Sequence, residues 1–215
     1  MHKIRQIIIW AVLGFFSLSA SAIVLEQSPL DGGDGSLSVG PSGIQIAADN
    51  FQFANDVQLT NISWWGSYDP AAPVTESFTV RLFEDDGSGN PETNFLFETI
   101  FTGAGDSSDG LADLFGGTVY QYGINVNQAL QGGVDYYLSV FNNDHAQDWF
   151  WLESAAGNGT GWSRAADGDI WNFDQSAPNM SYRLTTADVP EPATLLLMLL
   201  PLLWFKNRFS LRTVR

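Results

Sequence analysis

Cysteine is absent from all 215 residues of the sequence. Disulfide bonds, thiol nucleophiles and cysteine metal centres are therefore excluded, and the folded part must rely on its core and on any bound cations for stability. Histidine is nearly absent too, because His145, in a polar turn, is the only one after His2. We expect His145 to be exposed, since a Ser-His-Asp triad needs a buried, oriented imidazole and the flanking residues indicate none.

Positive charge is scarce in the long central part of the chain. All 24 acidic residues lie between Glu26 and Glu191, and this interval holds no lysine and three arginines, which leaves a charge of about −21 before terminal groups. Such a surface attracts cations and repels phosphate backbones, so we expect no nucleic-acid partner. The composition fits an extracellular acidic protein better than a cytosolic enzyme. The three arginines are Arg81, Arg164 and Arg183.

The first 22 residues have the three parts of a secretory signal peptide. Lys3 and Arg5 precede an apolar run over residues 7–20, and Ala20 and Ala22 form a small-residue cleavage site of the A-x-A type. This pattern predicts export through the general secretion machinery and removal by signal peptidase. An uncleaved N-terminal anchor is the alternative, which is less favoured because the apolar run is short and ends in small residues.

The last 27 residues, 189–215, also have three parts. Val189-Pro190-Glu191-Pro192 is followed by an apolar run over residues 193–205 and then by a basic tail. A helix over that run covers roughly 20 Å, less than the ~30 Å hydrocarbon core of a bilayer, and Pro201 would weaken it further. We therefore predict a short hydrophobic helix that anchors the chain temporarily, with the basic tail on the cytoplasmic side.

This arrangement of motif, apolar segment and basic tail resembles the PEP-CTERM sorting signal of Gram-negative bacteria. The resemblance implies that an exosortase recognises Val189, Pro190, Glu191 and Pro192 and processes the chain at the outer surface of the inner membrane. The product would then lie at the cell surface or in the extracellular matrix. A permanent C-terminal anchor without cleavage is the alternative.

Two segments of the central region also resemble exported PEP-CTERM proteins. The first is Trp64-Trp65-Gly66 followed by Phe78-Thr79-Val80-Arg81, and the second is Tyr136-Tyr137-Leu138-Ser139-Val140 followed by Trp149-Phe150-Trp151. The resemblance implies a secreted β-sandwich and brings no catalytic motif with it.

Residues 23–188 are expected to form one domain, which is long enough to bury a sizeable core. The clearest period-two pattern places Phe78, Val80 and Leu82 on one face of a strand. About nine or ten short strands, separated by turns rich in Gly, Ser and Asp, indicate an all-β antiparallel sandwich or jelly roll. The only helical candidate is a single turn over residues 111–115.

Tryptophans are candidates for a ligand site, because sugar rings stack on exposed aromatic faces. Trp64 and Trp65 must point to opposite faces of a regular strand, so one of them is expected to be exposed. Trp162 and Trp171 are flanked by Gly, Ser, Asn and Asp, and we expect them at exposed loop positions. The alternative is that the tryptophans fill the interior. The candidate glycan-binding residues are Trp65, Trp149, Trp151, Trp162 and Trp171.

Acidic turns are candidates for calcium, which takes roughly six to eight oxygen ligands. No turn completes an EF-hand, and Asp residues in Gly-rich turns are alternatively solvated turn formers that accept hydrogen bonds from nearby backbone groups. Asp167 and Asp169 form one of several sparser acidic turns. The candidate calcium ligands, from the densest turn, are Glu84, Asp85, Asp86 and Asn90.

The function that fits these features is a non-catalytic structural or glycan-binding module of an extracellular polysaccharide or biofilm matrix. The alternative is a carboxylate-based hydrolase acting on matrix polysaccharide. That activity would need two carboxylates roughly 5–9.5 Å apart in a cleft. The predicted partners are exosortase, the secretion machinery and extracellular polysaccharide, and calcium is the one candidate cofactor.

Overall fold

The computed structural model describes residues 22–41, 44–69, 71–73, 75–144 and 146–188. The predicted signal peptide up to residue 21, the predicted sorting signal from residue 189 and His145 lie outside these residues, so the structure does not test those predictions. Residues 22–188 form one unit by their internal contacts.

The described residues form fourteen β-strands and no α-helix. This part of the chain accordingly contains no helix that is long and apolar enough to cross a membrane. The strands are β1 (Val24–Gln27), β2 (Gly35–Leu37), β3 (Ile46–Gln52), β4 (Val57–Asp69), β5 (Glu76–Glu84), β6 (Phe97–Gly103), β7 (Asp106–Ala112), β8 (Thr118–Leu130), β9 (Asp135–Asn142), β10 (Asp148–Ser154), β11 (Gly161–Arg164), β12 (Asn172–Asp174), β13 (Asn179–Met180) and β14 (Tyr182–Asp188).

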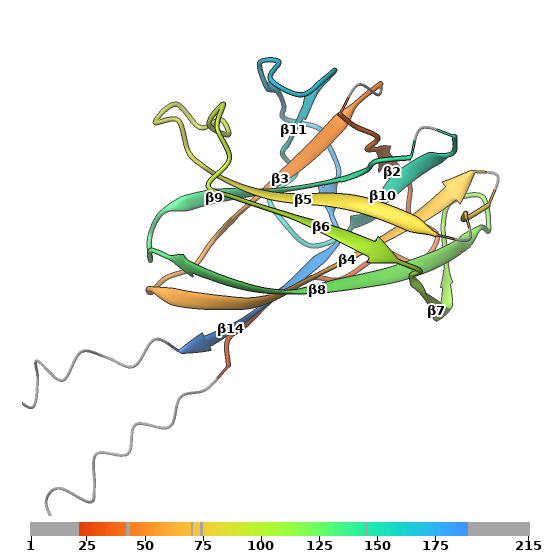
Figure 1. Cartoon of the computed structure of the whole chain (residues 1–215), viewed down its shortest axis with the longest axis horizontal. Coiled ribbons are helices and arrows are strands. Elements are labelled where there is room, and N and C mark those ends of the chain that lie inside the picture. Colours follow the sequence, from red (N-terminus) through yellow and green to blue (C-terminus); the bar gives the residue numbers. More distant parts are fainter. Residues whose placement is uncertain (1–21, 42–43, 70, 74, 145, 189–215) are drawn as a thin grey trace, which may run out of the picture. The chain divides into compact units, whose positions relative to one another are not determined.

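The strands form two antiparallel sheets that pack against each other (Figure 1). The eight-stranded sheet has the order β1-β14-β4-β10-β13, with β2 paired to β10, β8 to β4, and β7 to β8. The six-stranded sheet has the order β12-β11-β3-β9-β5-β6. Because each sheet buries one face against the other, the architecture is a β-sandwich. The expected all-β, antiparallel fold is therefore confirmed.

The main core lies between the sheets and is rich in aromatic side chains. Trp64 of β4 stacks on Tyr122 of β8, with ring centroids 5.5 Å apart. Phe78 of β5 reaches across from the other sheet and contacts Tyr122 at 4.7 Å and Trp149 at 4.8 Å. The expected period-two pattern is confirmed, because Phe78, Val80 and Leu82 are all fully buried in this core.

A second cluster of buried side chains lies on the outer face of the six-stranded sheet. Two connections partly cover this face. The connection after β11 supplies Trp171, and the β5–β6 connection supplies Asn90, whose Oδ1 accepts a hydrogen bond from Trp162 Nε1 at 3.3 Å. The six-stranded sheet is therefore buried on both faces over part of its area. The cluster comprises Ile46, Ala48, Phe83, Tyr137, Phe141, Trp162 and Trp171.

The expected helical turn over residues 111–115 is wrong. Residues up to Ala112 belong to β7, and the chain then turns back into β8. Asp113 stabilises this turn, because its Oδ1 accepts hydrogen bonds from the N–H groups of Phe115 at 3.0 Å and Gly117 at 2.7 Å. The short apolar run at this point therefore belongs to a β-hairpin. The strands are also more numerous than expected, and β4 and β8 reach 13 residues each.

Candidate functional site

Two arginines and two carboxylates form an ion-pair network on the outer face of the six-stranded sheet. Arg81 donates from Nη1 and Nη2 to the two carboxylate oxygens of Asp167, at 2.6 and 2.9 Å. Its Nε donates to Oε2 of Glu98 at 2.7 Å. Arg164 donates from Nη2 to Oδ1 of the same Asp167 at 2.6 Å. One carboxylate therefore joins two guanidinium groups from strands that are distant in the sequence.

Local structure explains how these side chains meet. Successive side chains along β5 point to opposite faces, so Arg81 points outward because Leu82 points inward. Asp167 lies in a turn that follows β11, where Gly168 adopts φ +84°, a conformation that favours glycine. The N–H of Asp167 donates to the carbonyl oxygen of Pro41 at 3.0 Å, which ties this turn to the connection between β2 and β3.

The arginines hold the carboxyl of Asp167 in its ionised form. The hydrogen bond from Arg81 lowers the pKa of Asp167 against the opposing effect of burial, and the charges of both arginines lower it further. For Arg81, burial acts to lower the pKa, but the hydrogen bonds to Asp167 and Glu98 outweigh it and the pKa is raised. Burial lowers the pKa of Arg164, and the nearby charge of Arg81 adds to this effect. The network is therefore a fixed set of charges near neutral pH.

Aromatic rings pack against both guanidinium groups. Cζ of Arg164 lies 4.3 Å from the ring centroid of Trp171, and Cζ of Arg81 lies 4.9 Å from that of Phe95. Contacts of this kind stabilise a buried positive charge. Arg164 is only 2% exposed, and among the described residues its Nε and Nη1 have no hydrogen-bond partner. The ring of Trp171 and the carboxylate of Asp167 therefore provide the main compensation for its burial.

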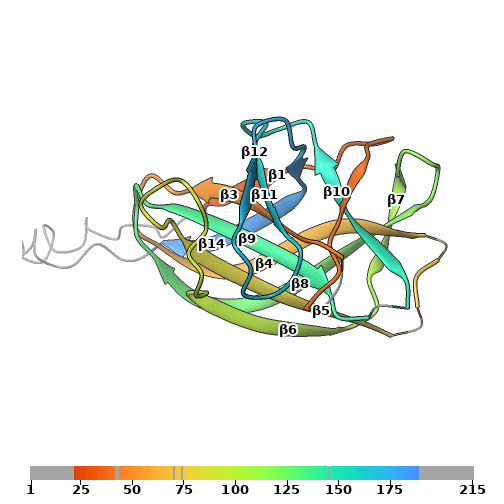
Figure 2. The ribbon, with the colours of Figure 1, turned by 90° about the horizontal axis from the view of Figure 1, so that it is seen from above.

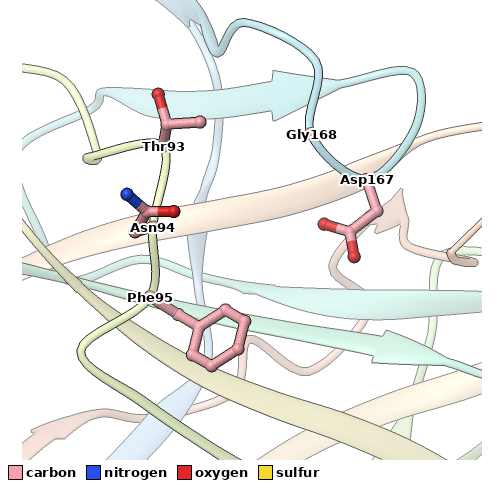
Figure 3. A pocket seen from close by; sticks show the side chains of 5 residues that line it. All are labelled: Thr93, Asn94, Phe95, Asp167 and Gly168. Carbon is pink, nitrogen blue, oxygen red and sulfur yellow. The ribbon is translucent and has the colours of Figure 1, made fainter.

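An open pocket of about 470 Å³ lies beside this network (Figure 3). Thr93, Asn94 and Phe95 of the β5–β6 connection line one side, and Asp167 and Gly168 line the other. Phe95 is 45% exposed, and the side chain of Asp167 is 36% exposed. The pocket therefore combines a half-exposed aromatic ring, a fixed carboxylate, a hydroxyl and an amide.

These groups suit a ligand with one apolar face and several hydroxyl groups. The ring of Phe95 would contact the apolar face, and Asp167 would accept hydrogen bonds. Asp167 supplies the one carboxylate among the residues that line the pocket. Because its pKa is lowered, it carries no proton to donate near neutral pH.

Four tryptophans occupy the two faces of the eight-stranded sheet. Trp149 and Trp151 share one face of β10, and both are fully buried between the sheets. Trp64 and Trp65 point to opposite faces of β4, as expected, but neither is exposed. Trp65 is only 4% exposed because it packs in a small cluster on the outer face of the sheet. Trp65, Trp149 and Trp151 therefore do not offer a ring face to a ligand.

The expected exposure of Trp162 and Trp171 is also wrong, because they are 6% and 7% exposed. The ring centroid of Trp162 lies 4.7 Å from that of Tyr137 and 5.2 Å from that of Phe173. Trp171 lies over Arg164. Their polar sequence neighbours suggested loops in solvent, whereas these loops fold back onto the outer face of a sheet. In the structure, the half-exposed ring beside a pocket belongs to Phe95.

The candidate calcium ligands make other interactions. Oδ1 of Asp85 accepts a hydrogen bond from the N–H of Gly87 at 2.6 Å, and Oδ2 accepts one from the hydroxyl of Tyr137 at 2.7 Å. Oδ1 of Asp86 accepts one from the N–H of Ser88 at 2.7 Å. Within the described residues, no group of three or more His, Cys, Asp or Glu side chains is placed to hold a metal ion. The four candidates lie around the turn that follows β5: Glu84, Asp85, Asp86 and Asn90.

Two carboxyl groups are buried inside the sandwich, which the sequence did not indicate. Asp49 of β3 is fully buried, its Oδ2 accepts a hydrogen bond from the N–H of Met180 at 2.6 Å, and burial raises its pKa to about 7. Glu76 is 1% exposed and accepts hydrogen bonds from the hydroxyl of Tyr122 and the N–H of Gly105. Neither carboxyl lines the pocket.

The scarcity of arginine was the sequence signal that could have located the network. Each of the three arginines of the domain pairs with a carboxylate, since Arg183 also donates from Nε to Oε2 of Glu26 at 2.7 Å. The period-two pattern placed Arg81 on the strand face opposite Leu82, and the acidic turn at Asp167 was also visible in the sequence. No local pattern shows that these residues meet, because 86 positions separate them.

Comparisons with known proteins give little functional information. A family model described as a domain of unknown function, DUF7901, matches residues 25–98, about a third of the chain. No protein of curated function matches. Solved structures of infectious bursal disease virus are similar over most of the chain. The Gt strain structure is 10% identical with a TM-score of 0.32, and that of the derived T=1 particles is 8% identical with a TM-score of 0.30. Each match covers 92% of this chain and 50% of the viral chain, so this chain spans about half the length of those proteins.

Proposed function

We propose that this protein is exported and acts without catalysis as a binding module for extracellular polysaccharide. The observation that supports this most directly is the pocket between Phe95 and Asp167, where a half-exposed ring lies beside polar groups. The C–H faces of a sugar ring are apolar and stack on aromatic rings, while its hydroxyl groups donate hydrogen bonds to carboxylates and amides. The pocket therefore matches the two kinds of surface that a sugar presents.

The ion-pair network supports a binding function because it fixes the position of the pocket walls. Asp167 is bonded to Arg81 and Arg164, and Phe95 packs against Arg81. Side chains held in this way lose little additional conformational freedom when a ligand binds, which favours affinity. An open site of this kind would gain overall affinity when several copies of the protein bind along one polymer.

A hydrolase is the weaker candidate for this pocket. Retaining and inverting glycosidases use two carboxyl groups, one of which donates a proton. The residues that line the pocket include the single carboxylate of Asp167, and its pKa is lowered rather than raised. This chemistry favours binding over bond cleavage.

The cellular part of the proposal rests on the sequence. We propose that the chain is an exosortase substrate that is anchored briefly in the inner membrane and then becomes part of the cell surface or the extracellular matrix. The resemblance of Val189-Pro190-Glu191-Pro192 and the following segment to a PEP-CTERM signal supports it. The large excess of acidic residues and the absence of cysteine are consistent with this location.

The binding proposal is tested with residues 22–188, which form a compact unit with all three buried clusters. Neutral and acidic bacterial polysaccharides would be screened by glycan array and by affinity electrophoresis, with calcium and with chelator. We expect retention by at least one polysaccharide, and at least a five-fold loss of affinity in F95A. Failure to bind any polysaccharide would overturn the binding function.

The matched control is F115A, because Phe115 is 90% exposed at the tip of the β7–β8 hairpin and does not line the pocket. We expect its affinity to equal that of the unaltered domain. If F115A and F95A lost affinity equally, the pocket would be the wrong site.

A further inference from the structure

Strand β6 ends the six-stranded sheet (Figure 2), and among the described residues no further strand pairs with its outer edge. The N–H of Leu96 donates to the carbonyl oxygen of Leu82, so Leu82 on β5 directs its backbone groups toward β6. Along an antiparallel ladder, successive residues direct their backbone N–H and C=O groups alternately to the two sides of the strand. Leu82 pairs with Phe97 in this register. The backbone groups of Phe97, Thr99 and Phe101 therefore face β5. Those of Glu98, Ile100 and Thr102 face outward, away from the sheet.

The other edges of the described sheets have features that hinder pairing with another chain. β2 has three residues, and the part of β8 that β7 leaves unpaired has a register shift opposite β4. β12 and β13 are three and two residues long. β1 has four residues, and β7 is irregular, with a register shift between Ser107 and Ala112. By contrast, β6 has seven residues in regular register with β5 and contains neither proline nor lysine. Short length, irregularity, proline and charged side chains are the usual protections of an edge strand. β6 has one of them, the charge of Glu98, and that carboxylate is paired with Arg81.

We propose that β6 is a self-association edge, on which β6 of a second copy of this chain pairs antiparallel with Ile100 at the centre. In this register Ile100 lies opposite Ile100 of the second copy, and Glu98 lies opposite Thr102 of the second copy. The outward groups of the three residues would form up to about six backbone hydrogen bonds across a two-fold axis. The two six-stranded sheets would then become one continuous sheet.

The charge pattern of the strand favours a second copy as the partner. The single acidic residue of β6 is Glu98, which faces threonine in this register and therefore meets no like charge. Its carboxylate is already paired with Arg81 at 2.7 Å. At the centre, Ile100 is 60% exposed and would contact its own counterpart, so a hydrophobic contact forms where exposed apolar surface now lies. β6 is thus complementary to itself.

The overall charge determines how this association responds to salt. The central part of each chain carries about −21, so two copies repel each other at long range. Salt screens this repulsion, while the contacts at β6 are backbone hydrogen bonds and an apolar pair. Association should therefore strengthen as salt concentration rises. An interface held by ion pairs would show the opposite response.

Site-specific cross-linking in residues 22–188 tests the register directly, because the chain contains no other cysteine. In the proposed pair the two Cα atoms at position 100 would be roughly 5.5 Å apart, within the roughly 4.4–6.8 Å that a disulfide spans. We expect I100C to form a covalent dimer under mild oxidation. The matched control is I170C, since Ile170 is 87% exposed outside β6. Equal cross-linking of the two variants would overturn the proposal.

Sedimentation velocity over a concentration and salt series provides the second test. We expect the unaltered domain to show a reversible dimer that is favoured by salt, and I100P to be at least ten-fold weaker because it removes an outward N–H. The β5–β6 ladder does not use that N–H, so circular dichroism should show that I100P is folded. I100K keeps the N–H but places like charges opposite each other, and it should also weaken the dimer, whereas I170K should not. A domain that stays monomeric at millimolar concentration and high salt, or a dimer that is unaffected by I100P and I100K, would show that β6 is not the interface.

Discussion

Oδ1 of Asp167 accepts hydrogen bonds from Nη1 of Arg81 and from Nη2 of Arg164, each at 2.6 Å. The two guanidinium groups belong to β5 and β11, strands of the same sheet that are not neighbours. A single carboxylate on a connecting turn therefore pairs with two buried guanidinium groups, and Glu98 supplies the second negative charge. Asp167 also fixes the wall of the proposed sugar pocket.

Replacing Asp167 with asparagine should destabilise the domain. The amide oxygen of D167N accepts hydrogen bonds without a negative charge, so Arg81 and Arg164 would remain buried without full compensation. We expect a loss of about 1–3 kcal/mol in the free energy of unfolding, since Asp167 is partly exposed and its interactions are partly screened. Urea denaturation followed by tryptophan fluorescence would measure it. E92Q, at an exposed acid on the neighbouring connection, should change stability by less than about 0.5 kcal/mol.

The effect of D167N should also depend on pH. Because the folded-state pKa of Asp167 is lowered, its contribution is fully present above the unfolded pKa, near 3.8, and is lost as pH falls through the folded pKa. The stability difference between the two proteins should therefore shrink at acidic pH. A difference that persisted unchanged at the lowest pH of the folded protein would contradict an electrostatic origin.

Asp49 should produce the opposite pH dependence. Burial raises its pKa from 3.8 to about 7 in the folded protein, so the folded state binds more protons than the unfolded state between these values. Stability from this group is therefore greatest below about pH 4 and falls as pH rises toward 7, by on the order of 4 kcal/mol. We expect D49N to flatten that decline in urea-denaturation free energies. If the free energy of unfolding of D49N fell as steeply between pH 4 and 7 as that of the unaltered domain, Asp49 would not titrate as inferred.

The turn after β5 gives a prediction about calcium. Carboxylate oxygens of Asp85 and Asp86 already accept hydrogen bonds from the N–H groups of Gly87 and Ser88. We therefore expect the melting temperature of the domain to differ by less than about 1 °C between millimolar calcium and chelator, because ligand-linked stabilisation requires binding to the folded state. A clear rise with calcium, abolished in D86N, would restore the turn as a calcium site.

The sorting prediction is tested in cells. Replacing Pro190, Glu191 and Pro192 together by alanine should leave a larger form in the membrane fraction, because the recognised motif is lost while the apolar segment remains. Immunoblots of membrane and medium fractions would separate the two forms. T213A, in the tail beyond the apolar segment, is the control and should be processed normally. Normal processing of the triple variant would remove the basis for an exosortase substrate.

Local sequence patterns predicted which segments form strands better than they predicted which side chains are covered by distant parts of the chain. The alternation around Val80 correctly placed its neighbours on two faces, because a strand reverses side-chain direction at every residue. It did not show that the outer face is also covered, since Trp171 and Asp167 arrive there from a distant connection. The polar neighbours of Trp171 were therefore taken as a sign of exposure. The burial of Asp49 was not predicted for the same reason, because its hydrogen-bond partner Met180 is 131 positions away.

The pairing of the first and last strands has a consequence for how the chain acquires its fold. β14 lies between β1 and β4, with Val24 opposite Thr185 and Tyr182 opposite Trp64. Contacts between such distant positions form slowly. A chain still emerging from a ribosome would lack β14, the strand that pairs with β1 among the described residues. The topology itself therefore delays completion of the sandwich until nearly the whole domain has been made.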